Sequence, residues 1–373
     1  MNPIPYLDLS RARMAIQAEL FERWQKIADA NAFILGPEVK QLEADFAAFL
    51  GATAVVGVGN GTDALVVALR ALGLEPGDEV LVPAFSFFAT AEAVVYAGGT
   101  PVFCDIDPAT YNLDPAELER RAMPRTRGVV GVHLYGRPFD ADAIAAFCRA
   151  RGLFLVEDSA QAHGAKYKGR RVGTLGDLSA WSFYPTKNLG AFGDAGAVSG
   201  MDGDLMRKVF RVANHGQTSR YHHVEIGTNS RLDSLQAAVL NLRLRTLDAD
   251  NAKRRALAAI YHERLTGVGD LRFPLDRPDD EPVFHQMTIA TARRDELQKF
   301  LAERGVGSSV HYPAPLHRLP AVASFLPEPP ELPHAERAAT EVLCLPMFAE
   351  LGADEAAGAA AAVAEFFAAG ARA

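Results

Sequence analysis

The sequence predicts an α/β protein built on a mostly parallel β-sheet that helices cover on both faces. Short, continuously apolar segments alternate with segments whose apolar residues recur at helical spacing, and this alternation is typical of strands buried on both faces. Hydrophobic residues make up 49% and charged residues 23% of the 373 residues, which are ordinary values for a folded globular protein. A chain of this length buries a large core without disulfides or metals.

The elements follow in order along the chain. Strands are expected at Ala54–Val58, Glu79–Val82, Pro101–Cys104, Gly128–Leu134, Phe154–Val156, Leu178–Phe183 and Ala195–Ser199. Helices are expected at Thr62–Leu72, Phe88–Tyr96, Ala141–Arg151, Ser234–Leu247 and Asn251–Leu265. Beyond residue 268 prolines become frequent, and a strand at Phe284–Ala290, a helix at Arg294–Arg304, an extended loop at Pro313–Pro333 and a closing helix at Asp354–Ala369 follow. This change predicts a large domain over residues 1–248 and a smaller C-terminal α/β domain over residues 249–373.

Charge and cysteine usage exclude several classes of protein. Lysine plus arginine is 38 and aspartate plus glutamate is 46, so the formal net charge is −8, which argues against nucleic-acid binding. Cys104, Cys148 and Cys344 are far apart, so we expect neither a metal site nor a disulfide framework. The N-terminus lacks the apolar stretch of a signal peptide, and no segment approaches the length of a membrane span. We therefore expect a cytoplasmic protein.

A glycine-rich turn follows the first expected strand. Gly59-Asn60-Gly61-Thr62-Asp63 opens a helix, and a helix N-terminus offers free N–H groups and the positive end of the helix dipole to a phosphate. An ordinary tight β–α turn is the alternative. A dinucleotide-binding turn is disfavoured because Thr62 stands in place of the third glycine.

Two further segments carry candidate chemistry. Glu157 and Asp158 follow the strand Phe154–Val156, and ligands of parallel α/β sheets bind at this carboxyl end; one acid can cap the next helix while the other faces a ligand. Lys187 follows the strand Leu178–Phe183 in a loop with tight turns and aromatic neighbours. A desolvated lysine has a lowered pKa and can form a Schiff base. A phosphate cradle, a strand-end aspartate and a loop lysine together match the needs of pyridoxal phosphate (PLP).

The chain resembles the DegT/DnrJ/EryC1/StrS family of sugar aminotransferases, which have the aspartate-aminotransferase-like fold (fold type I). The matching segments are Ile34–Val39, Gly59–Leu65, Glu157–His163, Ser182–Gly190, Gly227–Ala238 and His311-Tyr312-Pro313. They occur in the family's order and extend over nearly the whole chain. The resemblance implies a large PLP-binding domain followed by a small C-terminal domain.

The resemblance also implies roles for individual residues. Lys187 is expected to bind PLP covalently, and Asp158 to pair with its ring nitrogen. Gly61, Thr62, Asp63 and Ser182 are expected at the phosphate, Gln161 at the 3-oxygen, and Phe87 stacked on the ring. Asn229 matches the residue that reaches the phosphate from a neighbouring subunit, which implies a homodimer with shared active sites. Tyr184, Tyr221, Arg231, His311 and Tyr312 are expected as substrate contacts.

The implied reaction transfers an amino group from L-glutamate to a nucleotide-linked keto-hexose. Segments around Arg220–His223 and His311–Pro313 resemble members that act on 3-keto sugars. Phe85–Ala91 and Asn214–Gln217 resemble members that use UDP-linked 3-keto N-acetylated sugars, including uronates. Asn229–Asp233 resembles members that use dTDP-linked 3-keto-6-deoxyhexoses, so the nucleotide stays open. The product would be an amino sugar for a lipopolysaccharide or an antibiotic.

Three other functions compete with this interpretation. A PLP-dependent sugar dehydratase or lyase would share the fold, although members with that activity carry histidine where this chain has Lys187. A non-catalytic sensor protein would be expected to have lost Lys187 or Asp158. A nicotinamide oxidoreductase would depend on the turn at Gly57–Thr62 alone.

Overall fold

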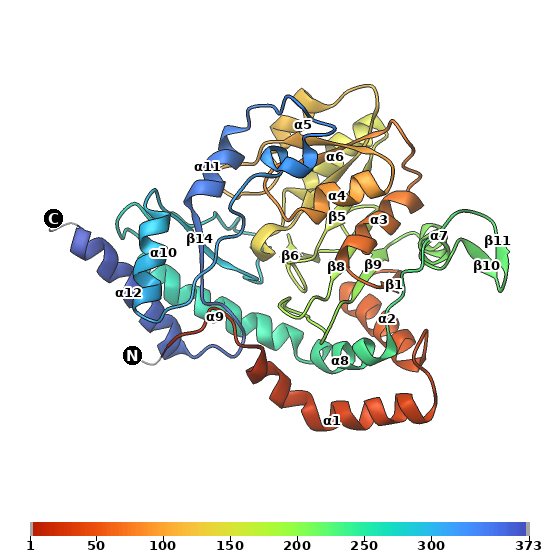
Figure 1. Ribbon diagram of the computed structural model, residues 1–373, viewed down its shortest axis with the longest axis horizontal. Helices are drawn as coiled ribbons and strands as arrows, with labels where there is room; N and C mark the ends of the chain where they lie inside the picture. Colours follow the sequence, from red (N-terminus) through yellow and green to blue (C-terminus); the bar gives the residue numbers. More distant parts are fainter. Residues whose placement is uncertain (1–2, 371–373) are drawn as a thin grey trace.

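The large part of the molecule is a seven-stranded sheet (Figure 1). The computed structural model describes residues 3–370. The strands lie in the order β1 (Ala54–Val58), β9 (Gly196–Gly200), β8 (Leu178–Ser182), β5 (Phe154–Asp158), β4 (Thr126–Val132), β2 (Glu79–Pro83) and β3 (Thr100–Cys104). Only β9 runs antiparallel to its neighbours, β1 and β8. The predicted mostly parallel α/β sheet is therefore confirmed.

Side chains alternate between the two faces of this sheet, as the two-residue period of a strand requires. In β2, Val80 and Val82 pack in one core with α3 (Gly61–Ala71), α4 (Ala89–Tyr96) and α7 (Gly203–Ala213). Leu81 faces the opposite side, against α5 (Pro115–Arg121) and α6 (Ala141–Arg151). On that opposite side α2 (Pro37–Leu50) and α8 (Ser234–Leu244) also cover β1 and β8.

A second core lies beside the sheet. Strands β13 (Met287–Ala290) and β14 (Val342–Leu345) pair antiparallel, and α9 (Leu247–Leu265), α10 (Arg294–Glu303) and α12 (Ala353–Gly370) pack with them. Ile4 is buried in this core too, so the start of the chain packs with its C-terminal part. The domain boundary near residue 248 remains a prediction.

Peripheral elements extend from this body (Figure 1). Helix α1 (Leu9–Asp29) lies along α8, and the hairpin of β10 (Gln217–Ser219) and β11 (His222–His223) projects away from the sheet. A small three-stranded sheet is formed by β6 (Lys166–Tyr167), β7 (Arg170–Arg171) and β12 (Asp280–Glu281). None of the helices within residues 3–370 is both long and apolar enough to cross a membrane.

Three sequence-based expectations need correction. The strand expected to end at Leu134 ends at Val132, because side chains bind the next backbone N–H groups: Asn112 Oδ1 accepts from Leu134 N at 3.0 Å, and Gln161 Oε1 accepts from Tyr135 N at 2.6 Å. The expected loop at Pro313–Pro333 contains short 3₁₀ turns at Leu316–Arg318 and Pro320–Val322. The helix expected to reach Leu247 ends at Leu244, and α9 begins at Leu247.

Helix α3 positions its first turn at the edge of the sheet where the candidate site lies. Asn60 caps its N-terminus, because the Asn60 side chain accepts a hydrogen bond from Asp63 N at 2.8 Å. The apolar positions of the helix bury Ala64, Leu65 and Ala68 against the sheet. These contacts hold its first turn at the carboxyl edge of the parallel strands, where ligands bind in such folds.

Candidate active site

A cavity of about 670 Å³ opens at the carboxyl ends of β5 and β8. Its volume falls within the range of roughly 300–1,000 Å³ typical of small-molecule sites. Ten predicted site residues line it: Gly61, Thr62, Phe87, Asp158, Gln161, Ser182, Tyr184, Lys187, His311 and Tyr312. The fold therefore brings together residues that are up to 251 positions apart, from Gly61 to Tyr312.

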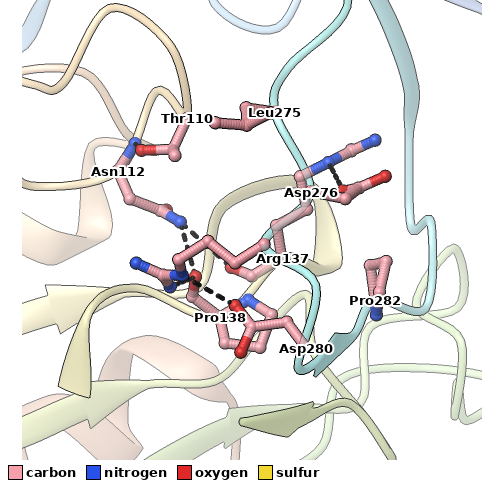
Figure 2. Close-up of a pocket in the computed structure, with 9 residues that line it drawn as sticks. Thr110, Asn112, Arg137, Pro138, Leu275, Asp276, Asp280 and Pro282 are labelled. Carbon is pink, nitrogen blue, oxygen red and sulfur yellow. Dashed lines mark hydrogen bonds and ion pairs between the residues drawn. The ribbon is translucent and has the colours of Figure 1, made fainter. Parts of the chain in front are cut away.

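A smaller cavity lies near the turn after β4 and is shown in Figure 2. Its volume is only about 10 Å³, which accommodates roughly one water molecule. It adjoins Arg137, whose guanidinium Nη1 and Nη2 atoms have no hydrogen-bond partner within residues 3–370. Arg137 Nε donates to Asp276 at 2.6 Å. This cavity is too small for a substrate, and the larger one is the candidate site.

Asp158 is the buried acid of the larger cavity, with 7% of its surface exposed. It ends β5, and its carboxylate accepts hydrogen bonds from Thr90 Oγ1 at 2.9 Å and from Ala160 N at 3.3 Å. Burial raises the pKa of Asp158, while these two donors and the charge of Lys187 oppose that rise. A cationic ligand facing the carboxylate would hold it ionised.

Lys187 supplies the amine. It follows β8 in a tightly closed loop, in which Lys187 N donates to Tyr184 O at 2.9 Å and Ala191 N donates to Phe183 O at 2.7 Å. Burial lowers the pKa of Lys187 to about 8, and the charge of Asp158 opposes this shift. An amine with this pKa is about one-tenth neutral at pH 7, far more than an ordinary lysine with a pKa of about 10.4, and the neutral form is the nucleophile.

The first turn of α3 faces Ser182 at close range. A Cβ atom on Gly61 would lie 2.6 Å from Ser182 Cβ, so only glycine permits this approach. Gly61 and Thr62 line the cavity with helix N-terminal backbone N–H groups. Asp63, which was expected at the phosphate, does not line the cavity. Its backbone N–H donates to the Asn60 side chain, and its carboxylate accepts a hydrogen bond from Ser230 Oγ at 2.6 Å.

Aromatic side chains form one wall. Phe87 is exposed at the cavity, and its ring centroid lies 5.9 Å from that of Tyr312. Gln161 bridges this wall to the turn after β4, because it accepts from Tyr135 N and donates to Tyr312 Oη at 3.1 Å. Tyr135 Oη in turn donates to His311 O at 2.5 Å. The predicted residues Gln161, His311 and Tyr312 therefore belong to one hydrogen-bonded group.

Besides Asp63, three more predicted residues lie outside the cavity of this chain. Tyr221 is 78% exposed near the tip of the β10–β11 hairpin. Asn229 is exposed and forms an isolated β-bridge with Asn214, and Arg231 Nη1 donates to Asn214 Oδ1 at 3.5 Å. The cationic side chains lining the cavity within residues 3–370 are limited to Lys187 and, when protonated, His285 and His311.

Several residues that organise the site were not predicted. Thr90 binds Asp158, and Tyr6, His285 and Gln286 line the cavity. Glu157 was named from the sequence beside Asp158, with one of the two acids expected to cap the next helix, but it does not cap a helix. It is fully buried, faces away from the cavity and accepts hydrogen bonds from the backbone N–H groups of Gly173, Leu175 and Gly176 at 2.8–2.9 Å. The direction of Glu157 could have been predicted, since adjacent residues in a strand face opposite sides of the sheet. Thr90, Tyr6, His285 and Gln286 could not, because they come from distant segments of the chain.

The fold and the cavity together define an α/β enzyme that holds a lysine amine and a buried acid at the carboxyl edge of its sheet. Residues 14–364 match the DegT/DnrJ/EryC1/StrS aminotransferase family, and the chain belongs to this family. The predicted family and the predicted enzyme class are confirmed.

Three relatives illustrate the match. The chain is 45% identical to the pleiotropic regulatory protein of Geobacillus stearothermophilus, with 98% of each chain covered. It is 45% identical to the dTDP-3-amino-3,4,6-trideoxy-alpha-D-glucose transaminase of Streptomyces venezuelae, covering 92% of this chain and 91% of that protein. It is 42% identical to the UDP-2-acetamido-2-deoxy-3-oxo-D-glucuronate aminotransferase of Pseudomonas aeruginosa, covering 92% and 95%.

Two solved structures are similar over nearly the whole chain. The crystal structure of S. venezuelae DesV in complex with a ketimine intermediate superposes with a TM-score of 0.95 at 44% identity, covering 98% of this chain and 99% of that one. NtdA from Bacillus subtilis, with bound cofactor PMP, superposes with a TM-score of 0.90 at 30% identity, covering 98% and 86%. The aminotransferase fold predicted from the sequence is therefore confirmed.

Proposed function

We propose that the protein is a PLP-dependent aminotransferase that moves the amino group of L-glutamate to a nucleotide-linked 3-keto-hexose. The observation that carries the proposal is the presence of Lys187, Asp158 and the first turn of α3 around one cavity. Each of the three groups answers one chemical feature of PLP: the aldehyde, the ring nitrogen and the phosphate.

The residues present fit this cofactor. The N–H groups of Gly61 and Thr62, with the hydroxyl of Ser182, offer donors to a phosphate at the positive end of the α3 dipole. Asp158 would hold the pyridine nitrogen protonated, because a nearby carboxylate favours the cation. A structural relative that contains PMP, the aminated form of the cofactor, supports the same assignment.

When bound, PLP supplies an aldehyde for amines and an electron-withdrawing ring that stabilises negative charge on the adjacent carbon. Lys187 Nζ then has two tasks. Its amine would hold the cofactor in the resting enzyme. When free, the amine would carry the proton of the glutamate Cα to the cofactor, and in the second half-reaction it would carry a proton from the cofactor to the sugar carbon. Phe87 and Tyr312, which form one wall of the cavity, would lie against one side of the cofactor ring.

The position of the keto group is supported by the relatives. The enzymes of S. venezuelae and P. aeruginosa are named for a 3-amino and a 3-oxo sugar, respectively. They differ in the nucleotide, dTDP in one and UDP in the other. We therefore propose a 3-keto sugar as the acceptor and test both nucleotides.

A second copy of the chain would complete the site. Glutamate carries two carboxylates and a nucleotide sugar carries a diphosphate, yet no arginine lines the cavity within residues 3–370. Asn229 and Arg231 lie outside it, and Val224 and Ile226, which follow the β10–β11 hairpin, are exposed. Burial of these apolar side chains against a second copy would bring Asn229 and Arg231 of that copy to the cavity, in a homodimer with shared sites.

A regulatory role is the second candidate, since a 45% identical relative is named a pleiotropic regulatory protein. Catalysis is favoured because this chain keeps both Lys187, with a pKa of about 8, and the buried Asp158. A sensor that only bound a ligand would not need an amine with a lowered pKa.

The experiment uses purified enzyme, ¹⁵N-labelled L-glutamate and either a dTDP- or a UDP-linked 3-keto sugar. We expect an amino sugar carrying ¹⁵N in the mass spectrum with one of the two nucleotides. Lys187→Ala is the matched control and should give no labelled product. An unlabelled dehydrated sugar would indicate lyase chemistry, and unchanged sugar with both nucleotides would contradict the proposal.

A further inference from the structure

The N-terminal segment brings a tyrosine into the candidate site. Ile4 N donates to Gly305 O and Gly307 N donates to Ile4 O, both at 2.8 Å, so this segment is bound to the second core as a short parallel bridge. A Cβ atom on Gly307 would lie 2.4 Å from Tyr6 N. This close backbone packing fixes Tyr6, whose side chain lines the cavity.

Tyr6 lies in the middle of a row of hydrogen bonds. Its hydroxyl lies 3.1 Å from His311 Nε2 and donates to Gln286 Oε1. Gln286 Nε2 lies 3.4 Å from His285 Nε2, and His285 Nδ1 lies 3.1 Å from Asn188 Oδ1. Asn188 directly follows Lys187, so the row connects the substrate side of the cavity with the lysine loop.

The far end of the row determines the direction of every bond in it. The amide nitrogen of Asn188 donates to Asn251 Oδ1 and to Val283 O, both at 3.0 Å. Asn188 Oδ1 must therefore accept from His285, whose hydrogen is on Nδ1. His285 is neutral, because burial and nearby positive charge lower its pKa well below the ordinary value, and its Nε2 accepts from the Gln286 amide.

The orientation of the Gln286 side chain also determines which nitrogen of His311 carries the hydrogen. Since the Gln286 amide nitrogen faces His285, its oxygen faces Tyr6 and accepts the hydroxyl hydrogen. The Tyr6 oxygen is then left to accept a hydrogen from His311 Nε2. Burial and the charge of Lys187 lower the pKa of His311, so its ring is neutral and carries a single hydrogen. Nδ1 of His311 consequently keeps a lone pair, and no partner for that atom is found in the described part of the chain.

We propose that Tyr6 is a positioning residue that fixes His311 with its hydrogen on Nε2 and its acceptor lone pair on Nδ1, so that His311 receives the hydrogen of a substrate hydroxyl. The identity of that substrate, a nucleotide-linked sugar, rests on the proposed function; the hydrogen position on His311 does not.

The first test observes the His311 ring directly, in enzyme labelled with ¹⁵N-histidine. The His311 signals are identified by their loss in His311→Gln. In the unaltered protein we expect the ¹⁵N shifts of a neutral ring with hydrogen on Nε2. Tyr6→Phe removes the acceptor, and we expect the shifts to move towards a mixture of the two neutral forms.

A second variant makes the opposite rearrangement. Gln286→Leu removes the acceptor of the Tyr6 hydroxyl, which can then donate to His311 Nε2, and the histidine hydrogen should move to Nδ1. Tyr96→Phe is the control, since Tyr96 is exposed and does not line the cavity. If His311 keeps its hydrogen on Nε2 in folded Tyr6→Phe and folded Gln286→Leu alike, the proposal is wrong.

The second test measures each half-reaction separately. Tyr6→Phe should raise the KM for the sugar and lower kcat/KM about tenfold, the loss expected for one well-placed hydrogen bond, while the half-reaction with glutamate changes less than about twofold. An unchanged sugar KM with turnover intact would overturn the role of Tyr6. Altered His311 shifts in a protein that aminates no sugar would support the positioning while removing the proposed function.

Discussion

Asp158 depends on a threonine that lies 68 positions earlier in the chain. The Thr90 hydroxyl donates to the ionised carboxylate at 2.9 Å and so lowers the pKa that burial raises. The Thr90→Val variant keeps the shape of the side chain but lacks the hydroxyl that donates to Asp158. A hydrogen bond to a charged group is worth about 1.5–3 kcal/mol, so we expect turnover to fall by at least about tenfold. The acid limb of the pH–rate profile should also move to higher pH, and an unmoved limb would contradict this account of Thr90.

Lys187 gives a prediction about pH. Because burial lowers its pKa to about 8, the fraction of neutral amine rises between about pH 7 and pH 9. The rate at which the apoenzyme binds added PLP covalently should rise over this window, with a midpoint near pH 8. In Asp158→Asn the nearby negative charge is lost, and the midpoint should move to lower pH. A midpoint near the ordinary lysine value of about 10.4 would show that the amine is not desolvated.

The sequence indicates Lys187 and Asp158 because each lies within a few residues of the end of a strand whose buried character is visible locally. It does not indicate Thr90, Tyr6 or Gln286, since their partners lie far away along the chain. Their side chains have polar groups of ordinary type, and only the fold makes them part of the site. Asn229 and Arg231, predicted as site residues, lie outside the cavity of a single chain, and their roles remain predictions.

At the scale of the element, the first turn of α3 requires glycine. Gly61→Ala would place a Cβ atom 2.6 Å from Ser182 Cβ and push the helix away from the serine. We expect the dissociation constant for PLP to rise at least about tenfold, or roughly 1.4 kcal/mol. Gly203→Ala is the matched control, because Gly203 also begins a helix, α7, and its nearest neighbour would lie at 3.7 Å. Equal PLP affinity in the two variants would exclude a close-packed phosphate cradle.

The strands were predictable and some of the helices were not. Buried strands show as short apolar runs, and all seven strands of the large sheet lie where these runs predicted them, within a few residues at the ends. Helices α1 and α2 were not predicted; α1 buries only Leu20 and Ile27 among its apolar residues. The early end of β4 depends on Asn112 and Gln161, two side chains that local sequence does not connect with it.

The whole molecule is predicted to work as a dimer with shared sites. Lys187→Ala and Asn229→Ala should each be inactive alone. In a mixed dimer, one site combines the intact Lys187 of one subunit with the intact Asn229 of the other. After subunit exchange at equal concentrations, activity should recover to about a quarter of the unaltered enzyme, since half the dimers are mixed and each has one good site. No recovery, with exchange verified by mass spectrometry, would show that each chain uses its own Asn229 or none.

The central claim is that Lys187, Asp158 and the first turn of α3 hold PLP for amino transfer. The most direct measurement is the absorbance spectrum of the purified protein, supplied with PLP, before and after L-glutamate. The account predicts a visible band from lysine-bound PLP that disappears with glutamate as the aminated cofactor forms, and that is absent in Lys187→Ala. The absence of this band, or a band that does not change when glutamate is added, would contradict the account.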